Sequence, residues 1–140
     1  MRIAQKTYYA LRALLELARR RGDGPISIAA IGHAEDIPPQ FLQVIMRELR
    51  QGGFVDSRRG KDGGYLLSRE PEGLSMGEVI RFLEGDVAPV DLQHDQHPVF
   101  RPTWLAAQDT INSLYDGVSF QELIDRDRQL QDNFLPDYVI

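Results

Sequence analysis

Small and apolar residues recur every three or four positions over the first twenty residues, as on the buried face of an amphipathic helix. They fall at Ile3, Thr7, Ala10, Leu11, Leu14, Leu17 and Ala18. Three arginines close the segment and favour the negative end of a helix dipole, and Gly22 then favours a left-handed stop. The pattern predicts a helix over residues 3–20.

Two shorter helices are predicted next, and the second has a polar face. Ser27 is a favourable N-cap for an apolar segment over 28–34, and Pro39 opens a helix over 39–51. The apolar positions of the later helix share one face: Phe41, Leu42, Ile45, Met46 and Leu49. The other side is left to Gln40, Gln43, Val44, Arg47 and Arg50. Two short helices joined by a tight turn, the second with a polar outer face, are typical of a helix-turn-helix.

A short hairpin is predicted directly after the helix-turn-helix. Two strand-like runs within residues 54–67 flank a glycine-rich stretch, in which Asp62-Gly63 is a standard turn pair. The tip carries Arg58, Arg59 and Lys61. A basic hairpin in this position is typical of a wing, which lies beside a DNA duplex and offers arginine to a minor groove.

Capping signals mark two helices in the second half of the chain. A helix is predicted over 74–84 with Ser75 as its cap, and Glu78 completes a capping box. Ser119 and Glu122 form the same pattern before the last helix.

These elements predict a mainly α-helical fold with a small β-hairpin. Residues 1–85 form a winged helix-turn-helix DNA-binding domain, and residues 86–98 form an acidic loop. Residues 99–140 then hold a long C-terminal dimerisation helix, to about residue 115, and a last helix.

Charge is divided unevenly along the 140 residues, whose net charge is −5. Residues 1–70 carry 12 Lys and Arg against 8 Asp and Glu, whereas residues 71–140 carry 4 against 13. The asymmetry indicates a basic part that faces DNA and an acidic part that faces elsewhere.

Composition excludes several classes of protein. The absence of cysteine excludes a disulfide scaffold, a thiol nucleophile and a cysteine-ligated metal centre. The one sizeable apolar run, over 10–18, is interrupted by Arg12 and Glu16 and is too short to span a bilayer. We therefore expect a cytoplasmic protein with no membrane partner. No motif assembles a nucleophile with a base or forms a phosphate-binding loop, so we expect no enzymatic activity and no cofactor.

Six segments, taken in order, resemble one family of bacterial regulators. They are YALRALL at 9–15, GPISIA at 24–29, IPPQFL at 37–42, RGKDGGY at 59–65, GEVI at 77–80 and SFQEL at 119–123. The chain is similar to the winged helix-turn-helix regulators that include the iron–sulfur assembly regulator IscR, the nitric-oxide-sensitive repressor NsrR and the cysteine-metabolism repressor CymR. The arginine–glycine wing is the most specific of the six segments.

The resemblance implies a homodimer on double-stranded DNA, with recognition helices in successive major grooves and a wing arginine in a minor groove. It assigns base reading to Gln40 and Gln43 and the minor-groove contact to Arg59. Lys6 and Arg58 would contact phosphates. The full set expected at the DNA interface is Lys6, Gln40, Gln43, Val44, Arg47, Arg58, Arg59, Gly60 and Lys61.

The chain departs from the family at three places. Cluster-binding members hold iron through cysteines in the loop before the long helix, and that loop here reads LQHDQH at 92–97. The resemblance therefore implies a regulator without an iron–sulfur cluster. Pro38 stands where the family often has a capping serine. Val44 replaces a polar reader, and we expect it to contact a thymine methyl group.

The acidic loop is a weak candidate for a metal site. His94 and His97, with Asp91 and Asp95 nearby, offer imidazole and carboxylate ligands. Their spacing is weak evidence, and a solvated linker is the simpler interpretation. We assign no metal.

Four residues share one side of the predicted long helix: Trp104, Gln108, Ile111 and Tyr115. They would suit a ligand cavity, but an apolar stripe at helical spacing is more often an interface, so we assign them to the dimer.

The favoured function is therefore a sequence-specific transcriptional regulator, with repression the commoner mode in the family. The alternative is a winged-helix module that binds protein, or a partner-controlled regulator that does not bind DNA directly. The wing favours DNA, because a protein-binding wing has no need for Arg58, Arg59 and Lys61 together. A small-molecule or protein effector stays open.

Overall fold

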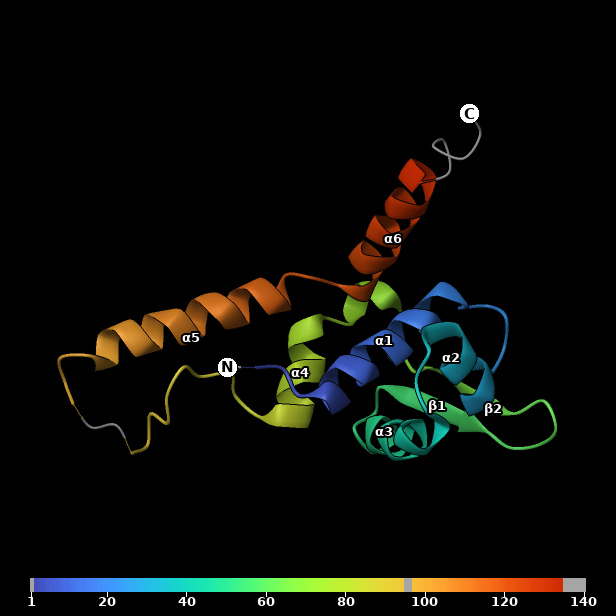
Figure 1. Cartoon of the computed structure of the whole chain (residues 1–140), viewed down its shortest axis with the longest axis horizontal. Coiled ribbons are helices and arrows are strands. Elements are labelled where there is room, and N and C mark those ends of the chain that lie inside the picture. Colours follow the sequence, from blue (N-terminus) through green and yellow to red (C-terminus); the bar gives the residue numbers. More distant parts are fainter. Residues whose placement is uncertain (1, 95–96, 135–140) are drawn as a thin grey trace.

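The computed structural model describes residues 2–94 and 97–134, and it confirms a mainly helical fold with one two-stranded hairpin (Figure 1). The first elements are α1 (Gln5–Arg19), α2 (Ile28–Glu35), α3 (Pro39–Gln51), β1 (Val55–Arg58) and β2 (Gly64–Leu67). They are followed by η1 (Pro71–Gly73), α4 (Met76–Glu84), α5 (Arg101–Asp116) and α6 (Phe120–Phe134). The end of the predicted region 99–140, from residue 135 on, lies outside the described residues.

Helices α2 and α3 form the helix-turn-helix at the predicted positions. The hydroxyl oxygen of Ser27 caps α2 by accepting a hydrogen bond from the backbone N–H of Ala30 at 3.1 Å. Asp36 turns the chain in the left-handed region, at φ 53°. Helix α3 then begins at Pro39, whose fixed φ suits the first helical position.

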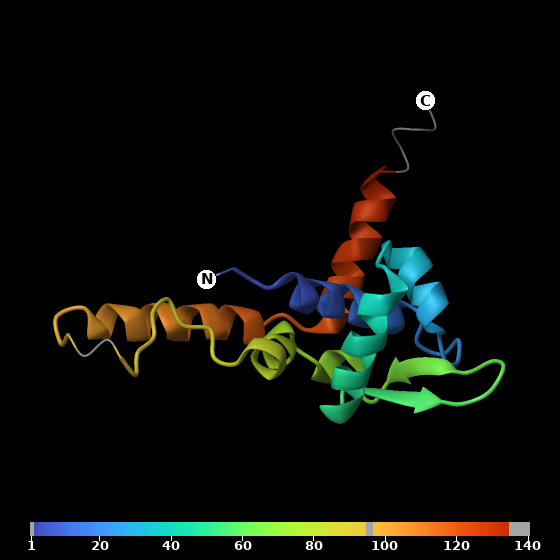
Figure 2. The ribbon, with the colours of Figure 1, turned by 60° about the horizontal axis from the view of Figure 1, so that its bottom comes forward.

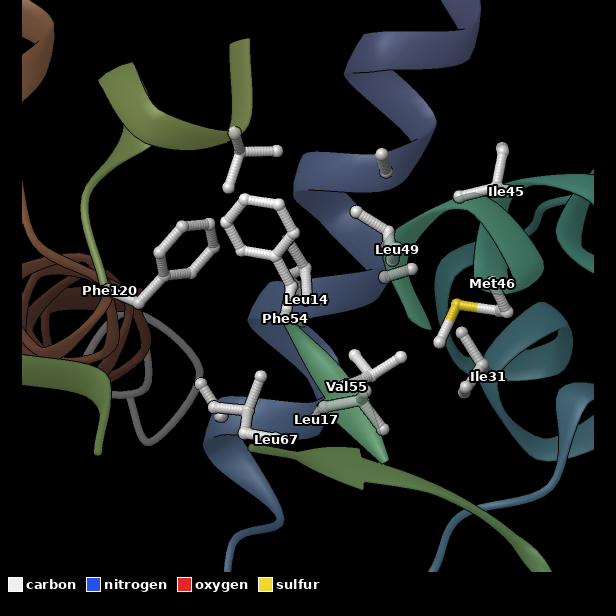
Figure 3. Packing of buried hydrophobic residues seen from close by; sticks show 14 of the residues in the cluster. Leu14, Leu17, Ile31, Ile45, Met46, Leu49, Phe54, Val55, Leu67 and Phe120 are labelled. Atoms are coloured by element: carbon white, nitrogen blue, oxygen red, sulfur yellow. The ribbon is translucent and has the colours of Figure 1, made fainter. Parts of the chain in front are cut away.

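Helix α1 lies at the centre of the core and packs against α2, α3, α4, α6 and β2. Figure 3 shows Leu14 and Leu17 of α1 among side chains from the rest of the fold, including Leu49, Phe54 and Phe120. Phe120 is fully buried, so the first turn of α6 closes the core on the side away from α3.

The turn of the hairpin differs from the predicted one. The N–H of Gly63 donates to the carbonyl oxygen of Gly60 at 3.1 Å, which centres the turn on Lys61 and Asp62. This is one residue earlier than the predicted Asp62-Gly63 pair. The reason is Gly60, which supplies the positive φ, at 115°, where the chain leaves β1.

The hairpin is anchored to the entry of α2. Strands β1 and β2 pair antiparallel, beginning with Val55 opposite Leu67. On the other side of β2, the N–H of Ile26 donates to the carbonyl of Tyr65 and the N–H of Tyr65 donates to the carbonyl of Ile26, each at 2.8 Å. Gly64 allows this approach, because a Cβ there would lie 2.3 Å from the Ile26 oxygen.

Both capping serines predicted in the second half of the chain are confirmed, but their partner glutamates bind arginines. Ser75 and Ser119 accept hydrogen bonds from the N–H groups of Glu78 and Glu122, at 3.2 and 3.1 Å. The carboxylates of Glu78 and Glu122, predicted to complete capping boxes, accept from Arg69 at 2.8 Å and from Arg126 at 3.3 Å instead. A charge-assisted bond to a guanidinium is stronger than one to a neutral backbone donor.

Helix α5 extends away from the rest of the molecule as an arm, while α6 rises from the side opposite α3 (Figures 1 and 2). Residues 85–94 lead from α4 out along α5 in both views. None of the residues of α5 is buried. In the part of the chain that the structure describes, every helix is too short or too polar to cross a membrane.

Candidate nucleic-acid interface

The outer face of α3 carries the side chains predicted to read bases. Its inner face is held in the core by four buried residues: Leu42, Ile45, Met46 and Leu49. The four predicted contacts are all exposed: Gln40, Gln43, Val44 and Arg47. Steps of three and four residues place Gln40, Gln43 and Arg47 on one stripe of the helix. A stripe of amides and a guanidinium matches the donor and acceptor groups on base edges.

Phe41 departs from the prediction. It was expected on the buried face of α3, but 48% of it is exposed. Its ring centroid lies 6.0 Å from that of Tyr9 on α1. Phe41 therefore lies at the edge of the outer face, where α1 passes beside α3.

The tip of the wing is exposed at all four predicted positions: Arg58, Arg59, Gly60 and Lys61. Arg58 ends β1, and its guanidinium donates to the carbonyl oxygen of Ser57 at 3.1 Å. Gly60 turns the backbone directly after Arg59. With no side chain at residue 60, the guanidinium of Arg59 has no bulky neighbour to hold the backbone away from a duplex.

Most of the cations on α3 and the wing lack a carboxylate partner in the part of the chain that the structure describes. Among the described residues, no carboxylate pairs with five of them: Arg47, Arg50, Arg58, Arg59 and Lys61. Four arginines elsewhere each have a carboxylate oxygen within 2.9 Å: Arg19, Arg21, Arg69 and Arg81. Helix α3 and the hairpin lie next to each other in both overall views. The unpaired cations therefore give one side of the molecule a positive surface that suits phosphate.

Lys6, the remaining predicted contact, is paired. Its Nζ lies 3.1 Å from a carboxylate oxygen of Glu48 on α3. The side chain of Lys6 is still 46% exposed, so its charge remains accessible from solvent. The pair ties the start of α1 to the outer side of the helix that carries the predicted readers.

Arg12 of α1 holds the end of α2, a role that was not predicted from the sequence. Its guanidinium donates to the carbonyl oxygen of Glu35, the last residue of α2. It also lies 5.7 and 5.9 Å from the ring centroids of Tyr8 and Tyr9. The available signal was its place within the apolar run of residues 10–18, because a cation among core positions needs a partner.

Arg19 binds carboxylates from three helices, and it too was not predicted. Its guanidinium lies 2.6 Å from Glu16, 2.9 Å from Asp127 of α6 and 3.3 Å from Glu35 of α2. Burial opposes the charge of Arg19, but its hydrogen bonds to Asp127 and Glu16 outweigh burial and raise its pKa. Burial raises the pKa of Glu35, and the charge of Glu16 adds to this against the opposing effect of Arg19. This cluster ties α1 to α2 and α6.

The predicted dimer residues lie on α5, and all four are partly buried within a single chain: Trp104, Gln108, Ile111 and Tyr115. Their neighbours Leu105 and Leu114 are 40% and 65% exposed. The side-chain oxygens of Gln108 and Asn112 are buried, and neither has a hydrogen-bond partner among the described residues. The arm therefore carries both exposed leucines and unsatisfied amides, which a lone helix in water does not favour.

The two histidines that are weak metal candidates make other contacts. His94 interacts with the carboxylate of Asp91, and the ring of His97 lies 5.1 Å from that of Phe100. The described residues contain no group of three or more His, Asp or Glu that could hold a metal ion. Asp95, the other predicted neighbour, lies outside the described residues.

Comparison with known proteins places this geometry among bacterial regulators. Residues 3–126 match the family described as Rrf2, iron-dependent transcriptional regulator. The HTH-type transcriptional regulator CymR of Bacillus subtilis is 34% identical over 88% of this chain and 89% of that protein. The solved structure of CymR, the global cysteine regulator of B. subtilis, superposes with a TM-score of 0.82 at 32% identity, covering 90% of this chain and 98% of that one. The structure of T. potens IscR gives a TM-score of 0.80 at 28% identity, covering 94% and 91%.

The family description names iron, and the residues present do not fit an iron–sulfur cluster. Such clusters are held by cysteine thiolates, and this sequence has no cysteine. The histidines and carboxylates that the structure describes form no alternative ligand group of three.

Proposed function

Because the chain belongs to the Rrf2 family of DNA-binding transcriptional regulators, we propose that it binds duplex DNA as a homodimer without an iron–sulfur cluster of its own. The observation that carries the proposal is the group of cations on α3 and the wing. Those on α3 and the wing have no carboxylate partner among the described residues, whereas four arginines elsewhere are closely paired. Unpaired cations beside exposed amides suit a surface that binds phosphates and base edges together.

Each protomer places α3 in a major groove and its wing over the adjoining minor groove. Gln40 and Gln43 read base edges, and Arg47 contacts a base or a phosphate from the same stripe. Arg59 enters the minor groove, where a narrow groove strengthens the negative potential. Arg58 and Lys61 bind the DNA backbone that flanks the minor groove, and Gly60 lies between these two cations in the sequence. Lys6 contacts a phosphate beside α3.

The dimer is built on α5. Leu105 and Leu114 lose their exposure to water when a second copy covers the arm. The half-covered stripe of Trp104, Ile111 and Tyr115 completes the contact. A two-fold dimer with one recognition helix per protomer requires half-sites centred about 34–36 Å apart, one turn of the duplex.

The proposed mode of regulation is repression in the cytoplasm. A dimer that covers two consecutive turns of DNA excludes other proteins from the same duplex. The relatives are named as transcriptional regulators, and the proposal includes no catalytic step.

The test is selection of bound duplexes from a random-sequence pool, followed by titration at several salt concentrations. We expect a two-fold symmetric site and a log–log salt slope of several units, because several phosphates are contacted. Light scattering at micromolar concentration should give the mass of a dimer. A pool without enrichment together with a flat salt response would overturn DNA binding and favour the protein-binding alternative. A monomeric mass would overturn the dimer alone.

A further inference from the structure

An exposed apolar patch interrupts the polar outer side of α3. Val44 is 47% exposed and Phe41 is 48% exposed, and both lie near the predicted readers. They line an open cavity of about 270 Å³ between α1 and α3, together with Gln5, Lys6, Tyr9 and Ile45. Its α3 side is formed by apolar residues, and Lys6 is one of the residues on its α1 side.

The position of Val44 places this patch within the surface proposed to face the major groove. Val44 follows Gln40 by four residues and precedes Arg47 by three, so all three are neighbours on the helix surface. Phe41 is three residues before Val44 and lies on the side toward α1, as its contact with Tyr9 indicates. Burial of this apolar pair is most favourable where an apolar group in the groove covers it.

The major groove of a duplex offers one apolar group on its base edges, the 5-methyl of thymine. The other groups there are hydrogen-bond donors and acceptors, which an aliphatic and an aromatic side chain do not satisfy. Lys6 lines the same cavity from α1, and its ammonium group, although paired with Glu48, is partly exposed on the side of a phosphate backbone beside such a base.

We infer that Val44 and Phe41 form a receiving site for a thymine methyl group, which fixes a T·A pair at one position of each half-site. The inference rests on the proposed function, because it requires α3 to lie in the major groove. To the contact that the sequence predicts for Val44, it adds Phe41 and the cavity as the rest of the site, and selection of this position through the methyl group rather than through hydrogen bonds. Gln40 and Gln43 read neighbouring base pairs by their amides.

The test uses a duplex selected by this protein from a random-sequence pool, in which each thymine is replaced in turn by deoxyuridine. The replacement removes the 5-methyl group and leaves the Watson–Crick pairing unchanged. At one thymine per half-site we expect affinity to fall about fourfold, the value of one buried methyl group. A cytosine placed at that position should bind more weakly than 5-methylcytosine, since only the latter restores the methyl group.

Val44→Ala separates a direct contact from an effect of uracil on the shape of DNA. Val44 is exposed, so its truncation leaves the buried face of α3 intact. In this variant the same deoxyuridine should cost less than about twofold, because the contact is already lost. Gln43→Ala is the matched control on the same face, and it should keep the fourfold effect. If no thymine is sensitive, or if Val44→Ala is as sensitive as the unmodified protein, the inference is wrong although DNA binding stands. If no duplex is selected at all, the proposed function itself has failed.

Discussion

Lys6 of α1 and Glu48 of α3 form an ion pair, with 3.1 Å between the ammonium nitrogen and a carboxylate oxygen, beside the surface proposed to face DNA. Both side chains are partly exposed, so the pair itself contributes little to stability. Its importance lies in competition, because a phosphate that approaches Lys6 must displace or share the carboxylate. Helix α3 therefore carries one carboxylate, that of Glu48, which opposes the binding of α3 to DNA.

We predict that Glu48→Gln strengthens DNA binding. The change removes a negative charge from the side of α3 and releases Lys6 to phosphate. Affinity should rise several-fold at low salt, and the magnitude of the log–log salt slope should increase by about one unit, the value of one added phosphate contact.

Glu122→Gln is the matched control for this change, because Glu122 also forms an exposed ion pair, with Arg126 on α6, the helix opposite α3. It should leave both affinity and salt slope unchanged. Weaker binding by Glu48→Gln would mean that Glu48 accepts a bond from the DNA, and that Lys6 is not held back by it.

Gly64→Ala should detach the wing from the entry of α2. The added Cβ would lie 2.3 Å from the carbonyl oxygen of Ile26, and neither backbone can move without breaking the paired bonds between Ile26 and Tyr65. We expect a loss of about 1–3 kcal/mol in the free energy of unfolding, measured by urea denaturation. Gly73→Ala, at a position where a Cβ meets nothing within 4 Å, is the control and should change stability by less than about 0.5 kcal/mol. Equal effects of the two variants would contradict the role of Gly64.

Short sequence patterns predicted the ends of the helices well where a residue type favours a single structural role. Pro39 and the glycines after residue 51 marked the bounds of α3 correctly, because proline suits a first turn and glycine suits a stop. Ser27 likewise located the start of α2. The wing was located by its glycines, but its turn was placed one residue too late, because Gly60 and Gly63 compete for the same role and only the strand register decides between them.

Tertiary contacts were the part that the sequence did not reveal. Phe41 was expected to be buried from its spacing alone, and its exposure depends on how α1 crosses α3. Arg19 gained its role from two carboxylates that are distant in sequence, Glu35 of α2 and Asp127 of α6, which approach it only in the fold. The base-reading residues and the dimer stripe stay predictions, because they depend on DNA and on a second protomer.

The partly buried cluster around Arg19 should make stability depend on pH through Glu35. The pKa of Glu35 is raised in the folded protein, so the folded state holds this proton more tightly than the unfolded state. Its contribution to stability is therefore present below the ordinary glutamate pKa and is lost as pH rises through the raised value. Relative to Glu35→Gln, the free energy of unfolding of the unmodified protein should decrease as pH rises from about 4 to about 8.

The measurement is urea denaturation of both proteins across that range. Glu72→Gln, at an exposed position of η1, is the control and should show no such trend against the unmodified protein. A difference that grows in favour of the unmodified protein as pH rises would show that Arg19 dominates burial at Glu35.

Arg59→Ala tests the wing. Arg59 is exposed, has no carboxylate partner among the described residues and stands directly before Gly60, whose backbone turns without a side chain. A guanidinium in a narrow minor groove senses a stronger negative potential than one at an open phosphate. Its loss should weaken binding by about 1–3 kcal/mol, mostly through A·T-rich positions that flank the half-site. Titration on a selected duplex, with each flanking base pair replaced in turn, measures both effects.

Arg128→Ala is the control. It removes the same charge from an exposed position of α6, on the side of the molecule opposite α3, and should change affinity little. If Arg59→Ala remains a folded dimer and binds as tightly as the unmodified protein at physiological salt, the wing does not read DNA, and specificity must come from α3 alone.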